Sequence, residues 1–192
     1  MRSIDDIFCD RTCYKFQDKP IDKDLLKKIY NIMKLGPTSG NSCPLRIIFV
    51  QSLKAKKKLL KCVMEGNIEK IKSAPVTALF AFAPQFYDQM DKTNPVAPKL
   101  KEYFLSSKEL ALDTAYRNST LQAAYFMIAS RGCGLDCGPM SGFDADAIEK
   151  EFFAGSGFKI NFICNLGYRD GKNPYPRLPR LDFTECCQFY PE

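Results

Sequence analysis

The 192-residue sequence contains no histidine and no tryptophan. The lack of histidine excludes Ser-His-Asp and Cys-His catalysis, HExxH zinc sites and any switch driven by histidine protonation. No apolar run approaches the roughly 20 residues that a membrane-spanning helix needs, so we expect no membrane segment. The first ten residues carry three acidic side chains and no apolar stretch, which argues against a secretory signal.

Cysteine pairs of the CxxC kind are also absent, although the chain has nine cysteines. Cys133 and Cys137 are separated by three residues, and Cys186 and Cys187 are adjacent, so neither pair has the spacing of a tetrahedral zinc site. We therefore predict no metal. Without an export signal, we expect reduced thiols in a cytoplasmic protein, most of them buried as small apolar side chains.

The length and amino-acid composition of the chain predict one globular domain spanning residues 1–192. Hydrophobic residues make up 45% and charged residues 26% of the chain, which is ordinary for a folded protein. The net charge of +6 favours anionic ligands slightly, but it does not indicate a nucleic-acid partner.

Hydrophobic periodicity and capping signals predict helices and strands in alternation. The helices are expected at residues 20–36, 52–65 and 107–131, and from Asp144 to about Gly155. The strands are expected at residues 45–51, 75–83 and 159–166, with a strand-like turn before Asp144. Residues 84–106 are expected to be irregular. This order predicts an α+β fold in which helices pack on a sheet.

Two segments have residue types that suit a bound ligand. Arg11, Cys13 and Lys15 alternate, so an extended chain would place them on one face, where two cations suit a phosphate or an electron-rich ring. For this segment alone, a charged edge strand is the alternative. Residues 36–44 contain glycines and small hydroxyl residues that allow a ligand to approach the backbone, although the P-loop pattern GxxxxGK[ST] is absent.

A third segment, residues 134–144, runs into a helix. Backbone amides just before a helix are natural donors to an electronegative ligand atom. We expect Asp144 to be the helix N-cap, and Ser141 and Gly142 to offer their amides to a ligand.

Taken together, these segments resemble the FMN-dependent nitroreductase superfamily over nearly the whole chain. Four of its motifs occur in order: Arg-x-Ser-x-Lys/Arg at Arg11–Lys15, Pro-Ser/Thr-Ser-x-Asn at Pro37–Asn41, Gly-Phe-Asp at Gly142–Asp144, and Arg-Leu-Pro at Arg177–Pro179. Each motif is weak alone, but four in this order are specific.

Within the superfamily, the chain is most similar to the malonic semialdehyde reductase subgroup. The shared segments are Gly36–Asn41, Gly66–Asn67, Ala74–Ala78, Tyr116–Gln122 and Gly134–Asp144. Cys13 replaces a common serine or a differing polar residue, and Cys43 and Leu45 replace the Gln and Trp of the wider family. These departures bear on substrate preference more than on cofactor binding.

The resemblance implies an intertwined homodimer with FMN at the subunit interface. Its α+β fold would have a central, mostly antiparallel sheet flanked by helices. The apolar helix at 107–131 would be buried against the partner, and the C-terminal tail, residues 171–192, would extend onto it.

The resemblance also implies roles for individual residues. Arg11 and Arg177, with Arg180 as a further candidate, would hold the FMN phosphate. Cys13 and Lys15 would line the pyrimidine edge of the flavin, where Lys15 stabilises the negative charge of the reduced ring. The backbone amides of Ser141 and Gly142 would orient flavin N5. The remaining cofactor-binding positions in the same chain are Thr12, Asn67, Pro139 and Met140. The partner chain would contribute Pro37, Thr38, Ser39 and Asn41.

The implied activity is ping-pong hydride transfer from NAD(P)H through the flavin to a small acceptor, which needs no protein nucleophile. The acceptor would be a carbonyl compound such as malonic semialdehyde, or a nitroaromatic or quinone. A non-catalytic flavin-binding protein is the alternative from another class. The sequence leaves open the acceptor, the choice between NADH and NADPH, a redox role for Cys13 or Cys43, and the shares of Arg177 and Arg180 in phosphate binding.

Overall fold

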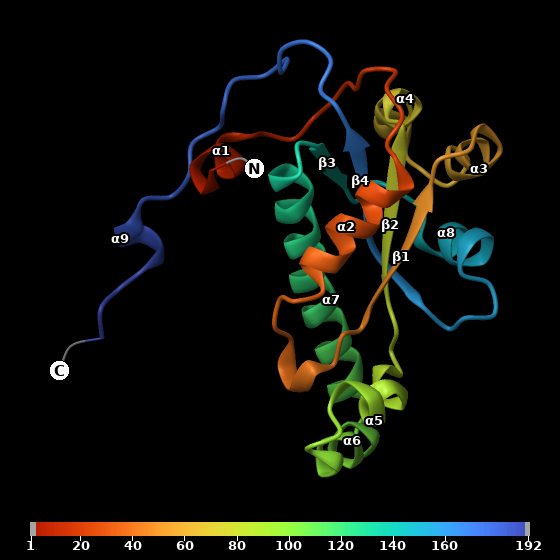
Figure 1. Cartoon of the computed structure of the whole chain (residues 1–192), viewed down its shortest axis with the longest axis vertical. Coiled ribbons are helices and arrows are strands. Elements are labelled where there is room, and N and C mark those ends of the chain that lie inside the picture. Colours follow the sequence, from red (N-terminus) through yellow and green to blue (C-terminus); the bar gives the residue numbers. More distant parts are fainter. Residues whose placement is uncertain (1–2, 191–192) are drawn as a thin grey trace.

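A computed structural model of the protein describes residues 3–190 and centres on a four-stranded sheet (Figure 1). The strands are β1 (Leu45–Val50), β2 (Val76–Phe82), β3 (Asp136–Met140) and β4 (Lys159–Gly167), in the order β1-β2-β4-β3. Each pair of neighbours is antiparallel. The predicted α+β fold with an antiparallel sheet is therefore confirmed.

Strand β2 is one of the two inner strands of the sheet, and both of its faces are covered. All seven of its residues are buried. Since successive side chains point to opposite faces, Phe80 joins the core on one side of the sheet and Leu79 joins the core on the other. A continuous apolar run, as in residues 75–83, is the pattern expected of such a strand.

Helices cover both faces of the sheet, which gives the molecule three layers (Figure 1). One face is covered by α2 (Lys23–Met33) and α7 (Lys108–Gly132). The other face is covered by α3 (Leu53–Leu59), α4 (Glu65–Ser73) and α8 (Ala145–Phe152). On the first face Ile29 and Phe126 pack with Phe80, and on the second Ile71 and Ile148 pack with strand residues.

Helix α7 has 25 residues and spans the length of its layer. Ser107 caps its start by accepting a hydrogen bond from the Leu110 amide, and Gly134, with φ of +89°, follows its end. The side that faces the sheet carries small residues and Phe126. Tyr116 and Leu121 are 53% and 40% exposed, so part of the apolar surface of this helix has no cover from residues 3–190.

The predicted helix caps agree with the structure, but one helix boundary does not. Asp22 accepts the Asp24 amide at the start of α2, and Asp144 accepts the Ala147 amide at the start of α8. The helix predicted at 52–65 ends at Leu59, and α4 then starts at Glu65. The sequence signal for α4 is weak because its apolar positions are few and Gly66 lowers its helix propensity.

The prediction that residues 84–106 are irregular was wrong. They form η2 (Phe86–Gln89), α5 (Met90–Thr93) and α6 (Pro98–Leu105). Pro98 lies in the first turn of α6, where the missing amide hydrogen costs nothing. These short helices are stable because Phe86, Met90 and Phe104 form a small buried core.

The two ends of the chain lie beside the body on the same side of α7 (Figure 1). The N-terminal end holds α1 (Ile4–Cys9), and the C-terminal tail holds α9 (Phe183–Cys186). Tail side chains are strongly exposed, reaching 68% at Leu178 and 92% at Tyr190. Residues 191–192 of the predicted tail lie outside the described residues. None of the described helices is long and apolar enough to cross a membrane.

Candidate functional site

A cavity of about 500 Å³ lies between the N-terminal segment and the C-terminal tail. We call it the arginine cavity, because Arg11, Arg131, Arg177 and Arg180 all line it. The other lining residues are Phe8, Asp10, Thr12, Tyr14 and Leu178. Four cations face one carboxylate, so the cavity attracts anions. The structure thus brings together the three arginines predicted to hold a phosphate and adds a fourth, Arg131.

The four guanidinium groups are bonded to backbone carbonyls and not to acids. Arg11 donates to the carbonyl oxygens of Tyr175 and Pro176, and Arg177 donates to those of Phe8 and Cys9. Arg180 donates to carbonyls within the tail, and Arg131 donates to Ile7. Within residues 3–190 none of the four has a carboxylate partner. Neutral carbonyls leave the positive charge uncompensated for an incoming anion.

The segment that carries Arg11 is fixed by Arg169, which the sequence interpretation missed. Its guanidinium forms a salt bridge with the buried Asp136 at 2.9 Å, and its amide donates to the same carboxylate. The guanidinium also donates to the carbonyl oxygen of Arg11 at 3.1 Å. Arg169 therefore ties the end of β4 to the segment that carries Arg11.

The prediction that Arg11, Cys13 and Lys15 share one face was wrong for Cys13. Its side chain is 2% exposed and packs with Phe16 and Ala74. Burial, reinforced by the charge of Asp136, raises the pKa of the Cys13 thiol to about 11. The segment is held by single contacts, such as the bond from the Cys13 amide to the Cys137 carbonyl at 2.9 Å, and not by a regular strand.

Lys15 lies on the outer side of this segment, with its side chain 72% exposed. Its ammonium forms a 2.7 Å salt bridge with Asp170, and the hydrogen bond to that carboxylate raises the pKa of Lys15. The neighbouring Thr12 presents its carbonyl to the side-chain amide of Asn173. Asp170 was not among the predicted site residues.

A second group of predicted residues meets at residues 138–144, which we call the glycine turn. The carbonyl of Gly142 accepts the Met64 amide at 3.0 Å and the Asn67 side-chain amide at 2.9 Å. A Cβ on residue 142 would lie 2.7 Å from the Asn67 side-chain nitrogen, so a larger residue here would force the Asn67 side chain to shift. Within residues 3–190 the amides of Ser141 and Gly142 donate to no acceptor, which leaves them available to a ligand.

Lys70 joins the glycine turn from α4, and sequence reasoning missed it. Its ammonium donates to the Asn67 side-chain oxygen at 3.1 Å and lies 5.3 Å from the centre of the Tyr14 ring. The spacing of three residues places Asn67 and Lys70 on one face of a helix. That signal becomes readable only once α4 is recognised. Pro139 and Met140 lie in the first part of the glycine turn and are the last two residues of β3.

The loop residues Pro37, Thr38, Ser39 and Asn41 lie far from the other two groups. The Ser39 amide donates to the Asn118 side chain at 2.8 Å, and the Tyr125 hydroxyl donates to the Pro37 carbonyl. Asn118 precedes Arg131 by thirteen residues on α7, which is about 20 Å of helix. Figure 1 shows the loop, followed by β1, near α5 and α6 at the opposite end of the molecule from α1 and α4.

The backbone of this loop is unusual. The short helix η1 (Ser39–Asn41) includes Gly40 with φ of +57°, and Asn41 and Cys43 also have positive φ. The Asn41 side chain holds the turn by donating to the Thr93 carbonyl at 2.6 Å. A fixed conformation that non-glycine residues rarely adopt points to a functional loop.

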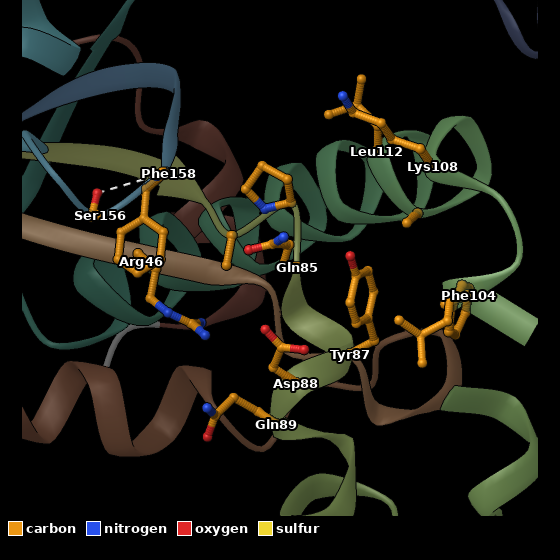
Figure 2. A pocket seen from close by; sticks show the side chains of 15 residues that line it. Arg46, Gln85, Tyr87, Asp88, Gln89, Phe104, Lys108, Leu112, Ser156 and Phe158 are labelled. Atoms are coloured by element: carbon orange, nitrogen blue, oxygen red, sulfur yellow. Dashed lines mark hydrogen bonds between the residues drawn. The ribbon is translucent and has the colours of Figure 1, made fainter. Parts of the chain in front are cut away.

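Another cavity, of about 890 Å³ and larger than the arginine cavity, is lined by none of the predicted residues. Figure 2 shows Arg46, Gln85, Tyr87 and Asp88 around it, near the start of α7. The Arg46 guanidinium donates to the carbonyls of Cys43 and Leu45 and stacks on a phenylalanine ring, so its contacts serve the adjacent backbone. Cavity size alone therefore does not locate the site.

The chain is similar in sequence to known proteins. The model of the nitroreductase family matches residues 11–168. A Polynucleobacter asymbioticus protein, assigned by name to the NADH dehydrogenase/NAD(P)H nitroreductases, is 45% identical over 93% of this chain and 90% of its own length. A Ralstonia nicotianae protein with the same assignment is 43% identical over 96% of this chain and 95% of its own.

Solved structures show the same fold at low sequence identity. A nitroreductase from Exiguobacterium sibiricum, crystallised in complex with FMN, has a TM-score of 0.88 at 17% identity and covers 99% of this chain and 98% of its own. A Bacillus subtilis nitroreductase has a TM-score of 0.82 at 21% identity, with 96% and 97% covered.

Proposed function

The chain belongs to the nitroreductase family, and from this we propose that it is an NAD(P)H-dependent oxidoreductase that carries FMN. The names of its relatives support the nicotinamide donor, and the FMN complex of its Exiguobacterium neighbour supports the cofactor. The observation that carries the proposal is the pairing of an arginine cavity with a turn whose amides are free.

The residues present fit the two ends of FMN. Arg11, Arg177 and Arg180 surround one cavity without carboxylate partners, which suits the dianionic phosphate. Asn67, Ser141 and Gly142 suit the polar edge and N5 of the ring. Bound FMN supplies reversible hydride transfer, so the protein needs no nucleophile of its own.

In catalysis, the chain itself would bind the flavin, orient its ring and neutralise the negative charge of the reduced ring. The free amides of Ser141 and Gly142 would orient the ring atom that exchanges hydride. The Lys15 ammonium would stabilise the negative charge of the reduced ring, with Asp170 setting how much of its charge is available. Thr12, Cys13, Pro139 and Met140 would contribute backbone and packing to the same surface.

We further propose a homodimer in which each FMN contacts both chains. Asn118, which holds the Ser39 end of the loop at residues 37–41, lies about 20 Å along α7 from Arg131, so a second chain would supply Pro37, Thr38, Ser39 and Asn41 to the arginine cavity. The exposed Tyr116 and Leu121 on α7 offer apolar surface for that contact, and the exposed tail after residue 171 offers another. Residues 1–192 would then form a single domain per chain.

The acceptor would be a small molecule: a carbonyl compound such as malonic semialdehyde, in keeping with the resemblance to that subgroup, or a nitroaromatic or quinone. No nucleic acid or membrane partner is proposed. Nine free cysteines, several of them exposed, fit a reducing compartment such as the cytoplasm. The competing proposal is a flavin-binding protein without turnover.

Anaerobic stopped-flow spectroscopy tests the proposal. Protein saturated with FMN should lose its absorbance near 450 nm, an approximate value for oxidised flavins, when NADPH or NADH is added. Reoxidation by malonic semialdehyde, a nitroaromatic and a quinone then ranks the acceptors. FMN that binds but is not reduced by either nicotinamide would favour the flavin-binding alternative. Failure to bind FMN at all would end the proposal.

A further inference from the structure

We infer that Arg131 is a fourth phosphate-binding residue, and that it helps the protein to prefer FMN over the unphosphorylated flavin. This inference rests on the proposed function and deepens it. Arg131 lines the arginine cavity together with Arg11, Arg177 and Arg180. It lies in none of the four motifs from which the flavin site was predicted.

The hydrogen bonds of Arg131 do not satisfy all of its N–H donors. One terminal nitrogen donates to the Ile7 carbonyl at 3.1 Å. The Nε atom is buried and has no hydrogen-bond partner within residues 3–190. A guanidinium has five N–H donors, and burying one of them without an acceptor is costly. An oxyanion in the cavity would compensate the charge that the protein itself leaves unpaired.

Arg131 also differs from the other three arginines in the element that carries it. Arg11 lies on an irregular segment, and Arg177 and Arg180 lie on the exposed tail. Arg131 belongs to the last turn of α7, whose inner side is buried against the sheet. A cation fixed on a rigid helix loses less freedom when it binds an anion, so it is better preorganised than the other three.

The alternative role for Arg131 is structural. A cation in the last turn of a helix interacts favourably with the terminal carbonyls, and the bond to Ile7 fastens α1 to α7. Neither effect distinguishes FMN from riboflavin, because both concern the protein alone. The ratio of the two affinities therefore separates phosphate binding from structural support.

The test titrates flavin-free protein with FMN and with riboflavin, using the quenching of flavin fluorescence. For Arg131→Gln we expect the Kd of FMN to rise on the order of tenfold or more, while that of riboflavin changes by less than about twofold. Arg117→Gln is the matched control, because Arg117 lies on the same helix and is exposed beside Asp113. It should leave both affinities unchanged.

Arg131→Lys guards against misfolding, because an ammonium can still donate to Ile7. It should reduce the FMN preference by about threefold, since it keeps the charge but not the planar fork. Equal losses for FMN and riboflavin, or an unchanged ratio in both variants, would overturn the inference. If the unaltered protein bound FMN no better than riboflavin, the inference would also fail. If it bound no FMN at all, the proposed function itself would fail, which is a different result.

Discussion

The arginine cavity and the glycine turn are both built from segments that are distant in sequence, but different forces assemble them. The cavity is held by long charged side chains that reach backbone carbonyls, such as Arg177 to Cys9. The turn is held by close approach: a Cβ on Gly138 would lie 2.6 Å from a backbone oxygen, and a Cβ on Gly142 would lie 2.7 Å from the Asn67 side-chain nitrogen. Long side chains adapt when one contact is lost, whereas close-packed backbone does not. The turn should therefore tolerate substitution far less than the cavity.

Gly138→Ala should have the largest effect. A Cβ at residue 138 would lie 2.6 Å from the Cys13 carbonyl oxygen, a backbone atom that cannot rotate away. We expect the free energy of unfolding to fall by about 2–4 kcal/mol, because β3 and the Cys13 segment must separate. Urea unfolding followed by circular dichroism measures it. Gly66→Ala, which meets no atom within 4 Å in α4, should be neutral or slightly stabilising. Equal effects of the two changes would show that the close approach at Gly138 does not limit stability.

Arg11→Ala and Arg177→Ala probe the cavity directly. Each should weaken FMN by about 1.5–3 kcal/mol and riboflavin by much less, because only FMN carries the phosphate. The unfolding midpoint of flavin-free protein should change little, since the remaining arginines keep their carbonyl contacts. Fluorescence titration with both ligands measures the difference. A parallel loss of both ligands would contradict a phosphate role for these residues.

The sequence predicted the site residues that belong to short motifs, but not those whose contacts depend on the fold. The arginines, the loop at residues 37–41 and the Asp144 cap were readable because each belongs to a short, ordered motif. Lys70, Asp170 and Arg169 were not readable, because their contacts depend on where α4 and the end of β4 lie. Cys13 was misplaced because alternation predicts a shared face only in a regular strand, and this segment is irregular.

The buried Cys13 thiol, which lies between the two regions, should make stability fall at high pH. Its folded pKa of about 11 exceeds the ordinary 9.0, so the folded state keeps the proton longer than the unfolded state does. This contribution is complete below pH 9 and is lost as the pH rises through 11, by about 3 kcal/mol in all. Cys13→Ala should flatten this part of the curve, measured by urea unfolding at several pH values. Cys186→Ala, at an exposed thiol, should leave the slope unchanged. If the slope persists in Cys13→Ala, other groups cause it.

The smallest predicted effect concerns Lys15 and Asp170, whose salt bridge lies on the exposed side of the segment between the two regions. If the Lys15 ammonium acts on the reduced flavin, Lys15→Met should lower the two-electron midpoint potential by roughly 10–30 mV. Asp170→Asn should raise it, because removing the carboxylate frees the lysine charge. These opposite shifts are the signature of a direct electrostatic effect, since a general loss of packing would move both variants the same way.

Lys72→Met is the matched control, because Lys72 also forms an exposed salt bridge, with Glu69, on the outer surface of α4. It should leave the potential unchanged. Spectroelectrochemical titration of each FMN-saturated variant gives the potentials, and a titration with FMN confirms full occupancy. An unchanged potential in Lys15→Met would exclude Lys15 and leave Lys70, the ammonium beside the glycine turn, as the next residue to test. If Lys70 had that role, the electrostatic and backbone contributions would both lie at the turn, and the arginine cavity would serve binding alone.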